Sequence, residues 1–189
     1  NLRDISSASV RISRQAAGLC RDMTQLLPEG ESFQSTLIAA PPGAGKTTLL
    51  REMVAALSNG SEERAPLRVG IVDERGELAG MYRGVPQLDV GFHTDVLDSC
   101  PKTLGIPMLM RSANPQVIAV DEITTAEDLT AMAAAANCGV ALLATIHALD
   151  EEELRRKPLY PVLAASQVFR RLITISVEAG QRRYQVRLL

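Results

Sequence analysis

The sequence has few aromatic residues and almost no excess of either charge. It contains three Phe, three Tyr and no Trp, and its 20 basic and 22 acidic residues give a formal net charge of -2 at pH 7. Proteins that handle nucleic acids combine a positive field along the phosphates with aromatic rings on which bases stack. Because both features are scarce, we expect no nucleic-acid partner.

Cysteine and long hydrophobic runs are scarce as well. Cys20, Cys100 and Cys138 are widely spaced and form no Cys-x-x-Cys pair, so the sequence indicates neither a disulfide framework nor a zinc site. No apolar stretch approaches the roughly 18 residues that span a bilayer, and the polar residues 1–4 do not resemble a signal peptide. We therefore expect a soluble protein in a reducing cytoplasm.

The apolar residues are grouped in short runs that are typical of buried strands. With 189 residues and 46% hydrophobic content, one domain can bury most of its apolar surface. Four almost continuously apolar runs, residues 36–40, 67–73, 117–121 and 140–145, alternate with helix-like segments. Strands buried on both faces of a parallel sheet have this pattern. The sequence predicts an α/β fold with a mainly parallel central sheet flanked by helices.

Local signals predict helices and a terminal hairpin around these strands. Residues 46–57 are rich in helix formers and are followed by a stop signal that ends at Gly60. Thr125 can cap a second helix. Residues 172–177 and 184–188 flank a turn and predict a C-terminal β-hairpin.

A glycine-containing loop joins the first predicted strand to the first predicted helix. This strand, loop and helix order is the context that a Walker A phosphate-binding motif requires. Lys46 is expected to reach the β- and γ-phosphates, and Thr47 to coordinate Mg²⁺. Ala40 stands where most such loops have their first glycine, and the alternative is a chance glycine turn before a helix. The predicted nucleotide-binding residues are Pro42, Gly43, Ala44, Gly45, Lys46, Thr47 and Thr48.

A second motif, of the Walker B type, is formed by an apolar strand that ends in two carboxylates. Asp121 is predicted to hold the Mg²⁺ shell, and Glu122 to polarise the water that attacks the γ-phosphate. A strand followed by an acidic helix cap is the alternative. Together the two motifs predict a P-loop protein that binds ATP with Mg²⁺ and hydrolyses it.

Two further strand ends carry polar groups that can face the same crevice. Glu74 and Glu77 are candidates for positioning water or Mg²⁺, with a solvated acidic loop as the alternative. Thr145 and His147 can sense the γ-phosphate from the end of another strand, although a histidine in such a position can also be structural. Loop arginines are candidates for completing a neighbouring subunit's site, or else surface residues: Arg75, Arg83 and Arg111.

With these motifs placed, the chain resembles the ATPase domain of the stage III sporulation protein AA family, which is related to the hexameric ATPases of type II and type IV secretion systems. The similar residues cover nearly the whole chain: 1–3, 37–50, 71–77, 95–102, 111–112, 114–122 and 144–147. In this resemblance Asp73–Glu77 looks like the acidic "Asp box" of secretion ATPases, and Ala144–His147 like their "His box". The catalytic candidates are therefore Lys46, Glu74, Glu122 and His147.

The resemblance implies a RecA-like core in a ring of subunits, expected to be a homohexamer. It also implies a place in the mother cell of an endospore-forming bacterium, peripheral to the membrane. There the ring would energise a channel to the forespore through membrane proteins as partners. A nucleotide-dependent scaffold with little or no hydrolysis is the alternative from a different class.

Two departures from the secretion ATPases limit what the resemblance implies. Ile123, Thr124 and Thr125 follow the Walker B carboxylates, where secretion ATPases usually have an arginine and an acid. Residues 1–189 are expected to be the ATPase domain alone, without the N-terminal domain of the family. If that domain carries the trans-acting arginines, this chain by itself is expected to be nearly inactive.

Overall fold

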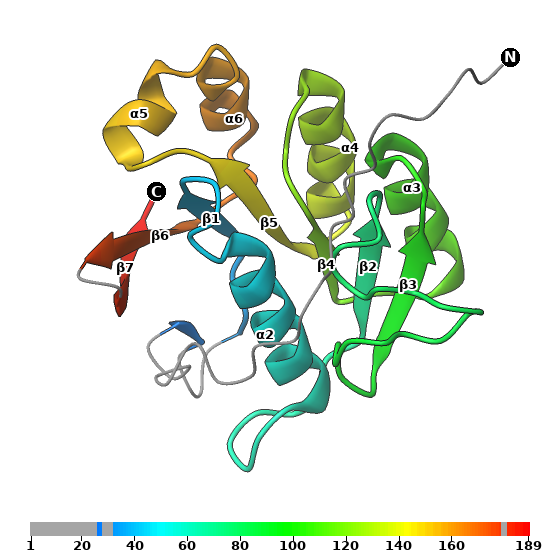
Figure 1. Cartoon of the computed structure of the whole chain (residues 1–189). Coiled ribbons are helices and arrows are strands. Elements are labelled where there is room, and N and C mark those ends of the chain that lie inside the picture. The colour runs from blue at the N-terminus through cyan, green and yellow to red at the C-terminus, as the bar shows by residue number, and fades with distance from the viewer. Residues whose placement is uncertain (1–25, 28–31, 179–180) are drawn as a thin grey trace, which may run out of the picture.

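A seven-stranded sheet with helices on both faces forms the centre of the molecule (Figure 1). The computed structural model describes residues 26–27, 32–178 and 181–189. Residues 1–4, Cys20 and the tip of the predicted hairpin turn lie outside these described residues. None of the helices in these residues combines the length and the hydrophobicity of a membrane-spanning helix.

The sheet has the strand order β3-β2-β4-β5-β1-β6-β7. Neighbouring strands are parallel except β6 and β7, which form the predicted antiparallel hairpin. All four predicted inner strands are confirmed, with bounds shifted by up to two residues at either end. The strands are β1 (Thr36–Ala40), β2 (Val69–Asp73), β3 (Thr94–Asp98), β4 (Val117–Val120), β5 (Ala141–His147), β6 (Arg171–Glu178) and β7 (Gln181–Leu188).

The described residues contain five helices, and the predicted caps of two of them are present. The first predicted helix ends at Asn59, and Gly60 caps it with a φ of 69° and an N–H that donates to Ala56 O. Thr125 caps the helix that follows β4: its hydroxyl accepts from Asp128 N, and the Asp128 carboxylate accepts from Thr125 N. The helices are α2 (Lys46–Asn59), α3 (Lys102–Ser112), α4 (Ala126–Asn137), α5 (Glu151–Arg156) and α6 (Tyr160–Ser166).

Each face of the sheet has its own hydrophobic cluster, because successive residues of a strand point to opposite faces. Along β1, Ile38 packs in the cluster that contains Met53 of α2. Its neighbour Leu37 packs in the cluster that contains Ile106 of α3 and Leu129 of α4. All five β1 residues are buried, which explains why this strand has no alternation of apolar and polar residues.

This topology brings the motifs to one edge of the sheet. Strands β1, β2, β4 and β5 run parallel, so their carboxyl ends lie at the same edge. The glycine-containing loop follows β1, and Asp121 follows β4. Residues 74–79 follow β2, and His147 is the last residue of β5. The candidate residues therefore converge although they are far apart in the sequence.

Candidate functional site

The loop between β1 and α2 has a backbone that glycine makes possible. Gly43 has a φ of 77° and Gly45 a φ of 104°, both in the region that favours glycine. No side chain of the described residues caps the start of α2. Since the first-turn N–H groups of an α-helix have no partner inside the helix, those of Lys46 and Thr47 suit an anion such as a phosphate.

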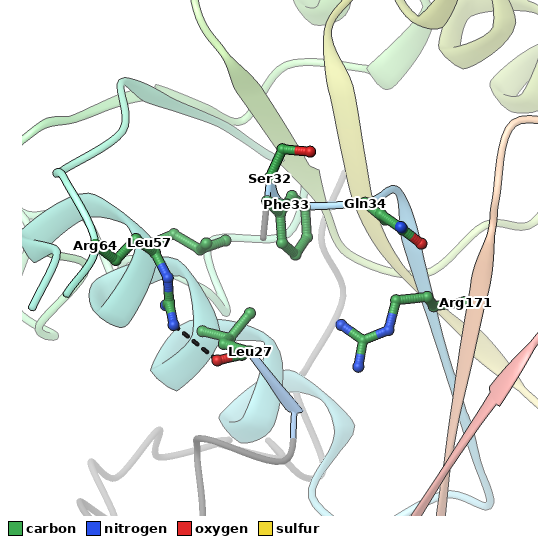
Figure 2. Close-up of a pocket in the computed structure, with 7 residues that line it drawn as sticks. All are labelled: Leu27, Ser32, Phe33, Gln34, Leu57, Arg64 and Arg171. Carbon is green, nitrogen blue, oxygen red and sulfur yellow. Dashed lines mark hydrogen bonds between the residues drawn. The ribbon is translucent and has the colours of Figure 1, made fainter. Parts of the chain in front are cut away.

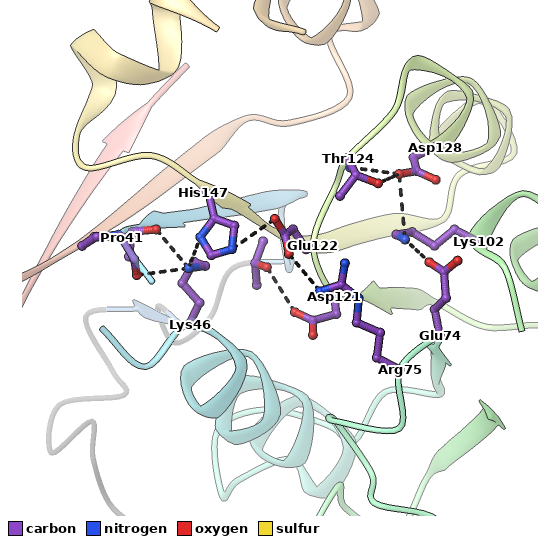
Figure 3. A network of polar contacts seen from close by, with 12 residues as sticks. Pro41, Lys46, Glu74, Arg75, Lys102, Asp121, Glu122, Thr124, Asp128 and His147 are labelled. Atoms are coloured by element: carbon purple, nitrogen blue, oxygen red, sulfur yellow. Dashed lines mark hydrogen bonds and ion pairs between the residues drawn. The ribbon is translucent and has the colours of Figure 1, made fainter. Parts of the chain in front are cut away.

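Lys46 is held against its own loop. Its Nζ donates to Ala40 O at 3.0 Å and to Pro41 O at 3.1 Å. It also lies 2.7 Å from His147 Nδ1 (Figure 3). Burial lowers the pKa of Lys46 from its ordinary value, and the carboxylates of Glu122 and Asp121 oppose this effect. The Lys46 ammonium therefore lies against the loop that is predicted to bind phosphates.

His147 connects the glycine loop to the carboxylate after β4. Its Nε2 lies 3.1 Å from Glu122 Oε1, and Arg75 Nη1 lies 3.4 Å from Glu122 Oε2 (Figure 3). Because Lys46 is a donor to Nδ1, a neutral His147 carries its proton on Nε2 and donates it to Glu122. Three predicted catalytic residues, Lys46, His147 and Glu122, thus form one chain of contacts.

Asp121 lies beside Glu122 but has a different environment. The Thr145 hydroxyl donates to Asp121 Oδ1 at 3.2 Å. Burial raises the pKa of Asp121, the Thr145 hydrogen bond opposes the rise, and the nearby Glu77 carboxylate adds to it. Thr145 therefore contacts the predicted magnesium ligand. The hydroxyl of Thr47 and this carboxylate are the hard oxygen donors that Mg²⁺ prefers.

The loop after β2 is organised by Asp73, to which the sequence analysis gave no separate role. Its fully buried carboxylate accepts three backbone N–H groups, from Glu77 at 2.9 Å, Leu78 at 3.0 Å and Ala79 at 2.9 Å. Glu74, predicted to be catalytic, is paired with Lys102 (Figure 3). The structure therefore does not bring Glu74 into the chain of contacts formed by Lys46, His147 and Glu122.

The three candidate arginines have separate surroundings. Arg75 contacts Glu122 of its own chain. Arg83 is exposed with its guanidinium 5.3 Å from the Tyr82 ring centre, and Arg111 is exposed in the last turn of α3. Arg182 of β7 was not predicted to belong to the site, and its Nε donates to Ala44 O at 2.8 Å. No local motif marks this residue, because only the packing of the hairpin brings it to the loop.

A small cavity lies elsewhere, between α2 and the residues before β1 (Figure 2). Its volume is about 10 Å³, which is the space of one water molecule. Arg64 Nη2 donates to Leu27 O at 2.7 Å in its wall. The cavity is too small for a substrate. Within the described residues, no three His, Cys, Asp or Glu side chains are grouped so that they can hold a metal ion.

Comparison with known sequences identifies relatives over almost the whole chain. The family model for sporulation stage III, protein AA, matches residues 1–186. The stage III sporulation protein AA of Bacillus subtilis (strain 168) is 40% identical over 179 residues, which are 95% of this chain and 58% of that protein. The chain thus spans less than two thirds of that relative's length.

Comparison with solved structures identifies the fold. The X-ray structure of the Legionella pneumophila ATPase DotB matches with a TM-score of 0.63 and 16% identity, over 92% of this chain and 50% of that one. The VirB11 ATPase of the Brucella suis type IV secretion system, crystallised with sulphate, matches with a TM-score of 0.57 and 15% identity, over 89% and 50%. At these identities the likeness concerns the fold alone, and the family follows from the sequence: this chain belongs to the sporulation stage III protein AA family.

Proposed function

We propose that this chain binds ATP with Mg²⁺ and hydrolyses it as the motor domain of a secretion-type ATPase. The observation that carries the proposal is the chain of contacts from Lys46 through His147 to Glu122 beside the glycine loop. Through His147 it connects a cation, to which we assign phosphate binding, with a carboxylate, to which we assign the orientation of water. Phosphoryl transfer depends mainly on such positioning and on charge stabilisation.

Nucleotide binding is assigned to the loop and the start of α2. The N–H groups of residues 43–48 would cradle the phosphates, helped by the positive end of the helix. Lys46 would exchange the carbonyls of Ala40 and Pro41 for phosphate oxygens. Thr47 and Asp121 would hold Mg²⁺, which neutralises phosphate charge.

Hydrolysis is assigned to Glu122. Its side chain is 23% exposed, so water can reach it, while His147 and Arg75 each hold one of its oxygens. Glu122 would accept a hydrogen bond from the attacking water and align it with the γ-phosphate. When Lys46 moves to the nucleotide, His147 loses its Nδ1 partner. We propose that His147 thereby reports phosphate binding to Glu122.

The biological setting is proposed from the relatives. The Bacillus subtilis relative is a sporulation protein by name, and DotB and VirB11 are ATPases by name. By analogy, this chain would work in a homohexameric ring in the mother-cell cytoplasm, with an arginine from elsewhere in the assembly completing each site. Membrane proteins of a sporulation channel would be its partners.

A scaffold that binds ATP and hydrolyses it slowly is the second candidate. It is favoured by the fact that Glu122 is engaged by both His147 and Arg75, which leaves water to compete for its oxygens. On this hypothesis nucleotide binding would order an assembly platform, and turnover would be incidental.

Phosphate release by the full-length protein separates these functions. We expect turnover that is abolished in Glu122→Gln and in Lys46→Ala and is unaffected by single-stranded DNA. Nucleotide binding without wild-type turnover would favour the scaffold. Stimulation by DNA would instead indicate a nucleic-acid motor and contradict the proposal.

A further inference from the structure

Lys102 is a buried cation in an unfavourable place. Its side chain is only 6% exposed and lies in the first turn of α3, where the helix dipole disfavours positive charge. That turn contains no acidic residue of its own. A buried ion pair is also a poor source of stability, since desolvation offsets the attraction between the charges. The groups that surround the Lys102 ammonium must therefore account for its position.

The partners of Lys102 come from two separate loops of the site. One is Glu74, directly after β2, and the other is Asp128 in the first turn of α4, at 3.8 Å (Figure 3). Asp128 Oδ2 in turn accepts the backbone N–H of Thr124 at 3.0 Å and of Thr125 at 3.2 Å. Lys102 thus joins the loop that contains Arg75 to the loop after β4, which begins at Asp121.

Close packing of α3 on β2 sets this arrangement. A Cβ atom on Gly105 would lie 2.7 Å from Val72 Cγ1, so only glycine allows the observed approach. Gly105 lies three residues after Lys102, and Val72 two residues before Glu74. Positions three apart share a helix face, so the contact that brings α3 against β2 also directs Lys102 to the end of that strand.

These contacts close a ring around the loop of residues 121–125. From Glu122 the ring runs to Arg75, then through adjacent Glu74 to Lys102, then to Asp128 and Thr124, two residues after Glu122. We propose that Lys102 is a positioning residue that clamps the two loops and so fixes Glu122 and Arg75 for catalysis. This inference rests on the proposed ATPase function. It also gives Glu74 an indirect role, as an anchor for Arg75.

The test uses Lys102→Met in the full-length protein, with Lys102→Arg as the conservative variant. Lys157→Met is the matched control, since Lys157, directly after α5, pairs with the exposed Glu153 and lies outside the ring. We expect Lys102→Met to lower kcat about 10-fold or more, because misplaced catalytic groups lose orientation, while nucleotide Kd changes less than about 3-fold. Lys102→Arg should recover part of the rate, and Lys157→Met should match the wild type.

A second readout does not depend on turnover. Hydrogen exchange of the nucleotide-free protein should become faster at the amides of Thr124 and Thr125 in Lys102→Met, and not in Lys157→Met. Unchanged exchange in Lys102→Met would overturn the clamp, whether or not the protein hydrolyses ATP. Equal losses of kcat, nucleotide affinity and thermal stability, with no recovery in Lys102→Arg, would show a purely structural role and also overturn it. Absence of wild-type phosphate release would instead refute the proposed function.

Discussion

Replacing Asp121 or Asp73, which lie at the ends of neighbouring strands, by asparagine should change the stability of the protein in opposite directions. The ionised form of Asp121 is unfavourable in the folded protein, because burial raises the pKa of this carboxyl group and the Glu77 carboxylate raises it further. Asp121→Asn should therefore stabilise the nucleotide-free protein. The gain should be at most about 1 kcal/mol, because Asn keeps the Thr145 hydrogen bond in weaker form. For a chain of this size this corresponds to a rise in Tm of about 2–4 °C.

Asp73, by contrast, has a carboxylate that stabilises the fold. Its carboxylate is fully buried and accepts three backbone N–H groups that shape residues 77–79. In Asp73→Asn, the amide NH₂ would face one or more of these donors and leave them unsatisfied. Since hydrogen bonds to a charged group contribute about 1.5–3 kcal/mol each, and Asn retains some of them, we expect a loss of about 2–4 kcal/mol.

Thermal unfolding without nucleotide, measured between pH 4 and 8, tests the expected gain in stability of Asp121→Asn and the expected loss of Asp73→Asn. A carboxyl group with a raised folded-state pKa costs stability only when it is ionised. The advantage of Asp121→Asn should thus be complete above that pKa and disappear as the pH falls through it. With Mg²⁺ and ATP added, the wild type should gain more stability than the variant. A lower Tm for Asp121→Asn at pH 8, or a neutral Asp73→Asn, would refute this account of the strand ends.

Two other residues give further predictions. Arg182→Ala should raise the Kd for nucleotide several-fold, because Arg182 Nε holds Ala44 O in the glycine loop. The kcat of this variant at saturating ATP should be nearly unchanged. A Kd equal to that of the wild type, measured with a fluorescent ATP analogue, would contradict this role. His147→Ala should retain nucleotide binding but lose about 10²-fold in kcat, because Glu122 loses a contact that orients it. Single-turnover kinetics would show the loss in the chemical step. A loss confined to KM would count against His147 as a link to Glu122.

The central strands and the glycine loop could be predicted because their signals are local. Strand β1 is apolar at nearly every position, and Lys46 follows a glycine pattern in the required context. The edge strand β3 was not predicted, since it has no continuous apolar run: Asp95 and Asp98 are exposed on it. Helix α3 was also missed. It contains Gly105 and Pro107, which normally argue against a helix, and Gly105 is explained only by its contact with β2.

The contacts within the site could be predicted only in part. Parallel strands place their carboxyl ends at one edge, which is why Glu122 and His147 could be expected near Lys46. The partner of Glu74 could not be foreseen, because Lys102 belongs to the helix that the sequence did not reveal. Arg182 reaches Ala44 across 138 positions of the sequence, through the register of a hairpin with no motif of its own.

The central claim is that Lys46 binds the phosphates of ATP and Glu122 drives their hydrolysis. The most direct test is to incubate the full-length wild type, Lys46→Ala and Glu122→Gln with Mg²⁺ and ATP, and then to identify the nucleotide that remains bound. We predict ADP on the wild type, intact ATP on Glu122→Gln and little nucleotide on Lys46→Ala. Equal nucleotide occupancy in both variants, or ADP formed on Glu122→Gln at the wild-type rate, would contradict the account.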